Sequence, residues 1–187
     1  ATSALQHGAG VRLFFCTDVV YGYTNDLTDA GLGELLESLV AVRGNAGMPG
    51  AAGSPDARGR GGLDLRKLSA GPDIHAPEVP FTARDKAWRL ERLRELAAGA
   101  RIAPEVKQVE GRLLEWEQDV AVATSEGAIA EDRRVRTRLM AQVIASDGVD
   151  TQAAHEGPGL SVGLELLARS PPAAVGRRAA EVALLNL

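Results

Sequence analysis

The feature that most constrains the fold is a long run of alternating apolar and polar residues at positions 134–145. One set of alternate positions is Val135, Thr137, Leu139, Ala141, Val143 and Ala145, and the other is Arg134, Arg136, Arg138, Met140, Gln142 and Ile144. Because successive side chains of an extended strand point to opposite faces of a sheet, this pattern predicts a long β-strand with one apolar face. The chain is therefore expected to contain a sheet that is buried on one side.

Shorter strand-like segments flank this long strand. They lie at 106–116, 120–124, 128–131 and 149–154, with turn-like residues between them at 117–119, 126–127 and 147–148. Asp147-Gly148 is a strong signal of a two-residue hairpin. One helix is predicted to open at a capping box, Thr82 to Asp85, and to run to about Ala98, and another follows Pro171-Pro172. Antiparallel strands in series, bracketed by helices, predict an α+β fold: a β-meander with flanking helices packed on one face.

The amino-terminal part of the chain has its own organisation. Two β-rich segments at 11–17 and 19–24 predict a hairpin, and leucines at helical spacing predict a helix at 29–43 with Thr28 as its N-cap. The stretch at about 44–80 is crowded with Gly, Pro and Ala, and its composition indicates an insertion or mobile loop.

The net charge and the short apolar segments limit the classes of binding partner that the sequence predicts. The formal net charge is -4, whereas binding to nucleic acid requires clustered Lys and Arg in excess, so no nucleic-acid partner is predicted. No segment approaches the roughly 20 continuous apolar residues of a membrane helix, so no membrane partner is predicted either. Cys16 is the single cysteine, which precludes an intrachain disulfide and suits a reducing compartment.

Both ends of the sequence indicate a piece of a longer chain. The first residue is Ala1 rather than an initiator Met, and a helical pattern from Ala173 stops at Leu187 without an evident terminating turn. We therefore expect a fragment of a larger protein.

Two short motifs resemble catalytic signatures but are incomplete. His155-Glu156 begins like the zinc-binding H-E-x-x-H helix, but the second histidine position is occupied by Gly159. Positions 159–163 match G-x-S-x-G, yet a nucleophilic Ser161 would need a histidine further along the chain, and none follows His155. The histidines and Cys16 are scattered without ligand spacing. We therefore predict no catalytic residue and no metal site within this chain.

A row of arginines is the strongest candidate for a contact surface. Arg134, Arg136 and Arg138 share one face of the predicted long strand, and Arg133 lies beside them. Such a row is most simply the solvated face of an antiparallel sheet. The functional interpretation is a docking surface for carboxylates, on a partner subunit or on a peptide terminus, where Arg binds in bidentate fashion.

The order of several motifs resembles the TldD/PmbA metallopeptidase family. The resemblance begins at residues 10–12 and 21–27, which are similar to a "GVRV" strand and the hairpin that leads into a helix in that family. It continues through residues 124–127, 130–134 and 136–139, which resemble the family's "NSEG" turn, "EDRR" strand and long following strand, and through residues 155–159. The sequence is more similar to the TldD side of the family than to PmbA.

The resemblance implies that residues 1–187 form the amino-terminal α+β domain of a larger two-domain protein, with an insertion or mobile loop at about 44–80. The zinc-binding H-E-x-x-x-H helix of the family would lie in an absent carboxy-terminal domain, because no position here matches it. The resemblance further implies a cytoplasmic protein that cleaves peptides, including in peptide maturation, as a homodimer or a TldD/PmbA-type heterodimer. This chain would then be a non-catalytic domain that shapes the substrate chamber and dimer contacts. The alternative is a zinc-free interaction module: a PmbA-like partner subunit or a protein that modulates DNA gyrase.

Overall fold

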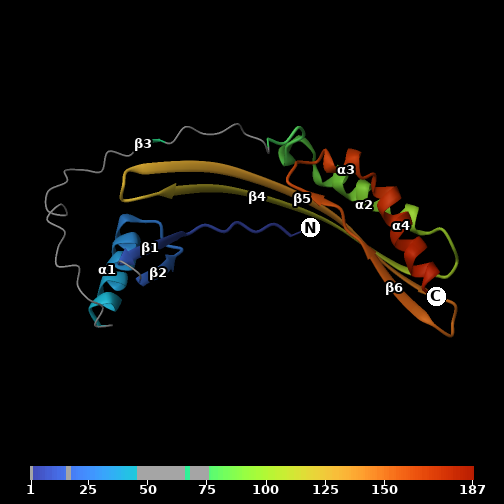
Figure 1. Ribbon diagram of the computed structural model, residues 1–187. Coiled ribbons are helices and arrows are strands. Elements are labelled where there is room, and N and C mark those ends of the chain that lie inside the picture. Colours follow the sequence, from blue (N-terminus) through green and yellow to red (C-terminus); the bar gives the residue numbers. More distant parts are fainter. Residues whose placement is uncertain (1, 16–17, 46–65, 68–75) are drawn as a thin grey trace. The chain divides into compact units, whose positions relative to one another are not determined.

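The computed structural model describes residues 2–15, 18–45, 66–67 and 76–187, and these belong to two compact units (Figure 1). The first unit is Ala1–Gly62 and the second is Leu63–Leu187. Each unit is α+β, as the sequence predicts. The first combines an antiparallel strand pair with one helix, and the second combines a mainly antiparallel sheet with several helices. None of the helices in the described ranges is long and apolar enough to cross a membrane.

The first unit is a hairpin with one helix. Strand β1 (Ala9–Phe15) pairs antiparallel with β2 (Asp18–Thr24), and helix α1 (Asp29–Asn45) follows. Thr28 caps the helix as predicted, because its hydroxyl accepts a hydrogen bond from the backbone N–H of Gly31 at 3.2 Å. The predicted hairpin and helix are both confirmed, although the residues between the strands, 16–17, lie outside the described part of the chain.

The second unit is built around one central strand. Strand β5 (Ala128–Ser146) pairs along nearly its whole length with β4 (Val106–Ala123) on one side. Its other side pairs in turn with β3 (Arg66–Lys67, parallel), β7 (Gly159–Leu160) and β6 (Thr151–Glu156). The predicted long strand is therefore confirmed, and it is longer than the alternation at 134–145 indicated.

Two predicted turns differ in the structure. Residues 117–119 do not form a turn but lie within β4, because they pair with residues 133–135 of β5 and the ladder satisfies their backbone groups. Asp147-Gly148 does form a turn, with Gly148 at φ 98°, but the connection is longer than a two-residue hairpin, since Ser146 pairs with Thr151. The carboxylate of Asp147 accepts the N–H groups of residues 149 and 150, each at 2.8 Å, and so stabilises the longer connection.

Three helices pack on one face of this sheet (Figure 1). Helix α2 (Lys86–Ala100) begins after a 3-10 turn, η2 (Phe81–Ala83). Asp85 is its N-cap and accepts the N–H of Trp88 at 2.8 Å, so the prediction that Thr82 opens the helix is wrong. Helix α4 (Pro172–Leu185) has Pro at its first position, as predicted, and the short α3 (Leu166–Arg169) carries no sequence signal of its own.

The core of the second unit lies between the helices and the apolar face of β5. It is made of small and aliphatic residues: Leu96, Ala100, Leu139, Ala141, Val143, Ala145, Ala154, Leu166, Leu167, Val175, Ala179, Ala180 and Ala183. Helices α2 and α4 approach backbone to backbone, because a Cβ on Gly176 would lie 2.1 Å from the carbonyl oxygen of Leu96. One face of the sheet is thus covered by helices, and the opposite face carries the arginine row.

Candidate functional site

The arginine row lies on the face of β5 that the helices do not cover. Arg134, Arg136 and Arg138 are all exposed and alternate with the buried Val135, Thr137 and Leu139, as the sequence pattern predicts. Across the ladder, Arg136 is opposite Trp116 and Arg138 is opposite Leu114 on β4. Cationic and apolar side chains therefore stand in direct cross-strand pairs on one open face.

The four arginines differ in their partners. Arg133 forms ion pairs with Glu117 and Asp119, and Arg134 pairs with Asp132 at 2.7 Å. In contrast, Arg136 and Arg138 have no ion pair with any carboxylate of the described residues. Their charge is therefore the part of the row that is available to an external anion.

Arg136 is held against an aromatic ring. The centre of its guanidinium lies 5.2 Å from the centroid of the Trp116 ring. This arrangement is a cation–π contact, which orients the guanidinium while its N–H groups stay available as donors. The indole of Trp116 is 43% exposed, so the contact lies at the surface.

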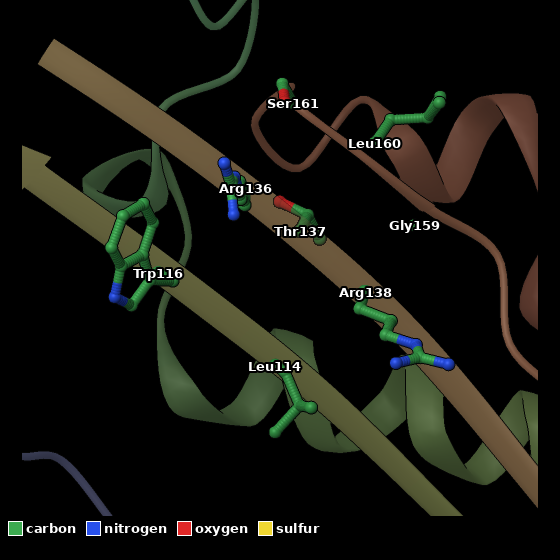
Figure 2. Close-up of a pocket in the computed structure, with 8 residues that line it drawn as sticks. All are labelled: Leu114, Trp116, Arg136, Thr137, Arg138, Gly159, Leu160 and Ser161. Atoms are coloured by element: carbon green, nitrogen blue, oxygen red, sulfur yellow. The ribbon is translucent and has the colours of Figure 1, made fainter.

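A pocket opens at this point of the sheet (Figure 2). It has a volume of about 460 Å³ and is open to solvent. Its lining comes from neighbouring strands: Leu114 and Trp116 of β4, Arg136, Thr137 and Arg138 of β5, and Gly159, Leu160 and Ser161 of β7 and the bend after it. Two guanidiniums thus border a lining that is otherwise mostly apolar.

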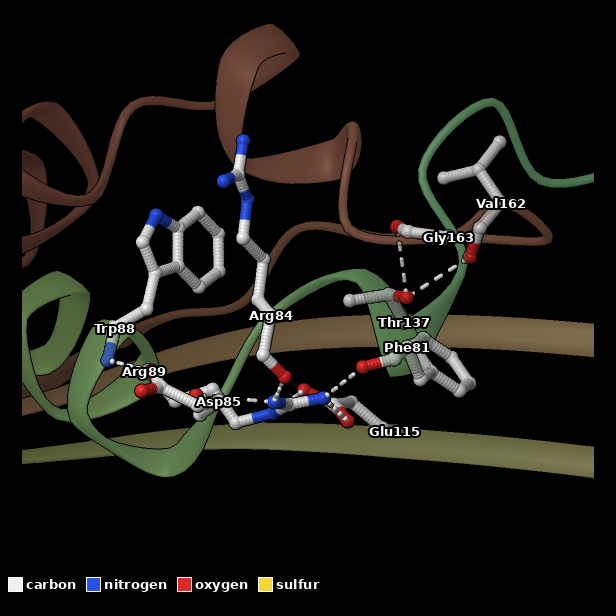
Figure 3. A network of polar contacts seen from close by, with 9 residues as sticks. All are labelled: Phe81, Arg84, Asp85, Trp88, Arg89, Glu115, Thr137, Val162 and Gly163. Carbon is white, nitrogen blue, oxygen red and sulfur yellow. Dashed lines mark hydrogen bonds and ion pairs between the residues drawn. The ribbon is translucent and has the colours of Figure 1, made fainter.

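The bend that completes the pocket is anchored to the buried face of β5. The hydroxyl of Thr137 lies 2.8 Å from the carbonyl oxygen of Val162 and 2.9 Å from that of Gly163, and it can donate to either (Figure 3). The backbone N–H of Leu139 donates to the carbonyl of Pro158 at 3.0 Å. Because both anchors are on the strand that carries the arginines, the bend and the row are positioned together.

A buried carboxylate fixes the same bend from the other side. Glu165 is 6% exposed and accepts backbone N–H groups from Gly163 at 2.9 Å, Glu78 at 3.1 Å and Val79 at 3.0 Å. Burial acts to raise the pKa of Glu165, but the donated backbone N–H groups outweigh it, and the pKa lies below its usual value. The carboxylate therefore ties the segment before α2 to the segment that leads into α3.

Strand β4 is fixed to the start of α2 by an ion pair. Arg89 donates two bonds to the carboxylate of Glu115, at 2.6 and 2.8 Å, and a third to the carbonyl of Phe81 at 2.7 Å (Figure 3). The bond to Glu115 raises the pKa of Arg89. Glu115 lies between Leu114 and Trp116 in the sequence, so this bidentate pair sets the position of the pocket's β4 wall.

A family model for the PmbA/TldA metallopeptidase central domain matches residues 79–187. The chain belongs to this family. The matched residues contain β4 to β7, the three helices and the whole pocket lining, so the arginine row is part of the domain that defines the membership. No curated protein matches the chain.

The family model describes a central domain, and its match begins after the first unit. The assignment of residues 1–187 to an amino-terminal domain stays a prediction, as does the more TldD-like character. Most of the predicted insertion at 44–80 lies outside the described residues, which there comprise only 44–45, 66–67 and 76–80.

Metallopeptidase membership raises the question of a metal site in this PmbA/TldA-family chain. Among the described residues, no group of three or more His, Cys, Asp or Glu side chains could hold a metal ion. His155 is an exposed residue within β6. Cys16 and His75 lie outside the described residues. The side chains in the described part of the chain therefore do not fit a zinc ion.

Ser161 lies in the pocket but lacks the surroundings of a nucleophile. It follows the two-residue strand β7, and none of the described residues that line the pocket is a histidine. A nucleophile elbow requires a strand-to-helix turn and a base within hydrogen-bond reach. The arrangement can bind and orient an anionic or apolar group, and its described residues contain no recognisable acid–base or nucleophilic machinery.

Proposed function

We propose that this chain is a non-catalytic domain of a zinc metallopeptidase that acts on peptides, and that it shapes the substrate chamber and dimer contacts. The observation that carries the proposal is the family match across residues 79–187, the region that contains the pocket and the arginine row. The zinc would be held by residues outside this 187-residue sequence, where it would activate water and polarise the peptide carbonyl. The residues of this chain would bind and orient the peptide.

An unpaired sheet edge supports a role in holding extended peptides. The outer edge of β4 has no strand partner among the described residues. An extended peptide can add to such an edge through backbone hydrogen bonds, which require no particular sequence. The guanidiniums of Arg136 and Arg138 on the open face of the neighbouring β5 would add an electrostatic attraction for acidic peptides.

The same edge supports the proposed assembly. A long strand with free N–H and C=O groups is a template for pairing with another chain. A homodimer or a TldD/PmbA-type heterodimer would cover such an edge, and the cytoplasmic location follows the family expectation. The unpaired edge of β4 is the surface that we propose for this contact.

Peptide binding by the intact chain tests the role of the arginine row. A labelled acidic peptide is titrated into the wild type and into Arg136→Ala plus Arg138→Ala, and its fluorescence anisotropy is recorded. We expect the double variant to bind more weakly, with a smaller salt dependence, because two cations are lost. The matched control is Arg177→Ala plus Arg178→Ala, which removes the same charge from the exposed face of α4. Equal affinity for the wild type and the arginine-row variant would remove the electrostatic part of the proposal.

Zinc content and intact mass, measured on one sample of the protein isolated from its source, test the enzymatic part. About one zinc per chain, with a mass well above the 19.6 kDa of these residues, would support the metallopeptidase. A protein that contains no zinc and still binds a partner would instead favour the interaction module, whether a PmbA-like subunit or a gyrase-modulating protein.

A further inference from the structure

The pocket contains two arginines that have no ion-pair partner among the described residues. Most surface arginines of the second unit are neutralised by a carboxylate, in pairs such as Arg112 with Glu110, Arg169 with Glu78 and Arg177 with Glu181. Arg136 and Arg138 have no such partner among the described residues, and both line the same pocket. Two cations without counter-charges in one concave site favour an anionic ligand.

The backbone around the pocket leaves room for Arg138. A Cβ on Gly157 would lie 3.3 Å from the Nη2 atom of Arg138, and a Cβ on Gly159 would lie 3.2 Å from its Cγ atom. The two glycines of the Gly157-Pro158-Gly159 segment therefore border the arginine side chain without crowding it. Arg136 is oriented by the Trp116 ring. The two guanidiniums are therefore accommodated by different parts of the pocket lining.

The pocket also has an apolar component beside the cations. Leu114, Trp116 and Leu160 are 49%, 43% and 47% exposed, which is unusual for large apolar side chains gathered in one place. Ser161 adds a hydroxyl at the rim. A ligand that fits this lining carries a carboxylate and an apolar group close to each other.

We propose that this pocket binds the C-terminal residue of a peptide, with the free carboxylate at Arg136 and Arg138 and the apolar side chain against Leu114 and Trp116. The inference rests on the proposed function, because it names the kind of peptide that the arginine row selects. The volume of about 460 Å³ suits the end of a peptide rather than a long segment.

The geometry of extended peptides favours a terminal carboxylate over an acidic side chain. In an extended chain, neighbouring side chains point to opposite sides, and the next one on the same side is about 6.5–7 Å away. A terminal carboxylate and the side chain of the same residue, in contrast, branch from one Cα atom. The direct pairing of Arg136 with Trp116 and of Arg138 with Leu114 places cation and apolar surface at the same point, which matches the terminal residue.

The test compares two peptides that differ only in their terminal group. A fluorescein-labelled Gly/Ser peptide that ends in leucine is prepared as the free acid and as the amide, and each is titrated into the intact chain. We expect the amide to bind about tenfold more weakly, since it loses charge-assisted hydrogen bonds to two guanidiniums. In Arg136→Gln plus Arg138→Gln the two peptides should bind alike, whereas Arg177→Gln plus Arg178→Gln should preserve the difference. Unchanged far-ultraviolet circular dichroism of the variants establishes that they are folded.

The outcomes separate this inference from the proposed function. Equal binding of the free acid and the amide by the wild type would overturn the terminal-carboxylate site while leaving peptide binding intact. An amidated peptide with an internal glutamate that binds as tightly as the free acid would also overturn it, in favour of an acidic side chain. Failure of every peptide, including the acidic one used above, would overturn peptide binding as a whole.

Discussion

The two faces of strand β5 have opposite characters, one buried and apolar and the other exposed and cationic. On the covered face, Leu139 and Val143 are fully buried beneath the helices. On the open face, Arg136 and Arg138 are exposed and stand opposite Trp116 and Leu114 of β4. One strand therefore contributes both the centre of the core and the wall of the candidate site.

Because of this difference, residues on one face of β5 should determine the stability of the unit, and residues on the other face should determine ligand binding. The free energy of folding comes mainly from apolar area removed from water, and that area lies on the covered face. The open face contributes little to it, so its residues are determined by what they contact outside the unit. Substitutions at neighbouring positions of β5 should consequently have effects of different kinds.

The largest expected effect is loss of a core side chain from the covered face. Leu139→Ala should lower the free energy of unfolding by about 3 kcal/mol, because it removes transfer energy and leaves a cavity in a close-packed core. The adjacent Arg138→Ala should change it by less than about 0.5 kcal/mol, as is usual for exposed positions. Both tryptophans, Trp88 and Trp116, lie in this unit, so urea unfolding followed by their fluorescence reports its stability.

Equal losses of stability from Leu139→Ala and Arg138→Ala would contradict the division between the two faces. Such a result would mean that the open face is itself buried in the folded chain. Peptide affinity should show the opposite pattern. Arg138→Ala should weaken peptide binding, whereas a core substitution that leaves the unit folded should not.

A second prediction concerns the helices that cover the buried face. Gly176→Ala should destabilise the second unit by about 2 kcal/mol, because the added Cβ would meet the backbone of Leu96 at 2.1 Å and the helices must move apart. Gly33 of α1, in the first unit, provides the control, since a Cβ there has no neighbour within 4 Å. Gly33→Ala should stabilise its own helix by about 0.5–1 kcal/mol. Thermal unfolding followed by circular dichroism distinguishes the two, and stabilisation by Gly176→Ala would contradict the close approach of α2 and α4.

The sequence was sufficient to predict those elements whose pattern is local. Alternation at 134–145 indicated β5 and both of its faces, Thr28 indicated the start of α1, and Pro172 indicated the start of α4. Predictions failed where tertiary pairing outweighed a local signal. The polar residues 117–119 resemble a turn, yet the ladder with β5 keeps them extended. Asp85, not Thr82, caps α2, because residues 81–83 form a 3-10 turn that no pattern signalled.

The candidate site could be predicted only in part from the sequence, because it also depends on tertiary pairing. Period-two spacing placed Arg134, Arg136 and Arg138 on one face, but it could not show which of them would have ion-pair partners. Trp116 and Leu114 become part of the site through the register between β4 and β5, and register depends on the whole ladder. The bend at 159–163 joins them through the Thr137 hydroxyl, a contact between residues far apart in the sequence.

Among the three destabilising substitutions, the smallest expected effect on the free energy of unfolding comes from a change at Glu165, which anchors the bend that completes the pocket. Glu165→Gln should lower the free energy of unfolding by about 1–2 kcal/mol at neutral pH. An amide keeps one acceptor oxygen but presents an NH₂ group toward one of the backbone N–H donors of Gly163, Glu78 or Val79. The measurement is urea unfolding of the wild type and the variant, followed by tryptophan fluorescence at several pH values.

The pH dependence of this difference follows from the direction of the pKa shift. The pKa of Glu165 is lowered in the folded state, so its stabilising contribution is complete above the unfolded-state pKa of about 4.3. The contribution is lost as the pH falls through the lower, folded-state pKa, because protonation removes the charge that the N–H groups bind. The stability gap between wild type and Glu165→Gln should therefore narrow below about pH 4. A gap that stays constant down to about pH 2 would mean that Glu165 stabilises the bend by packing alone, and the anchor would then be independent of its charge.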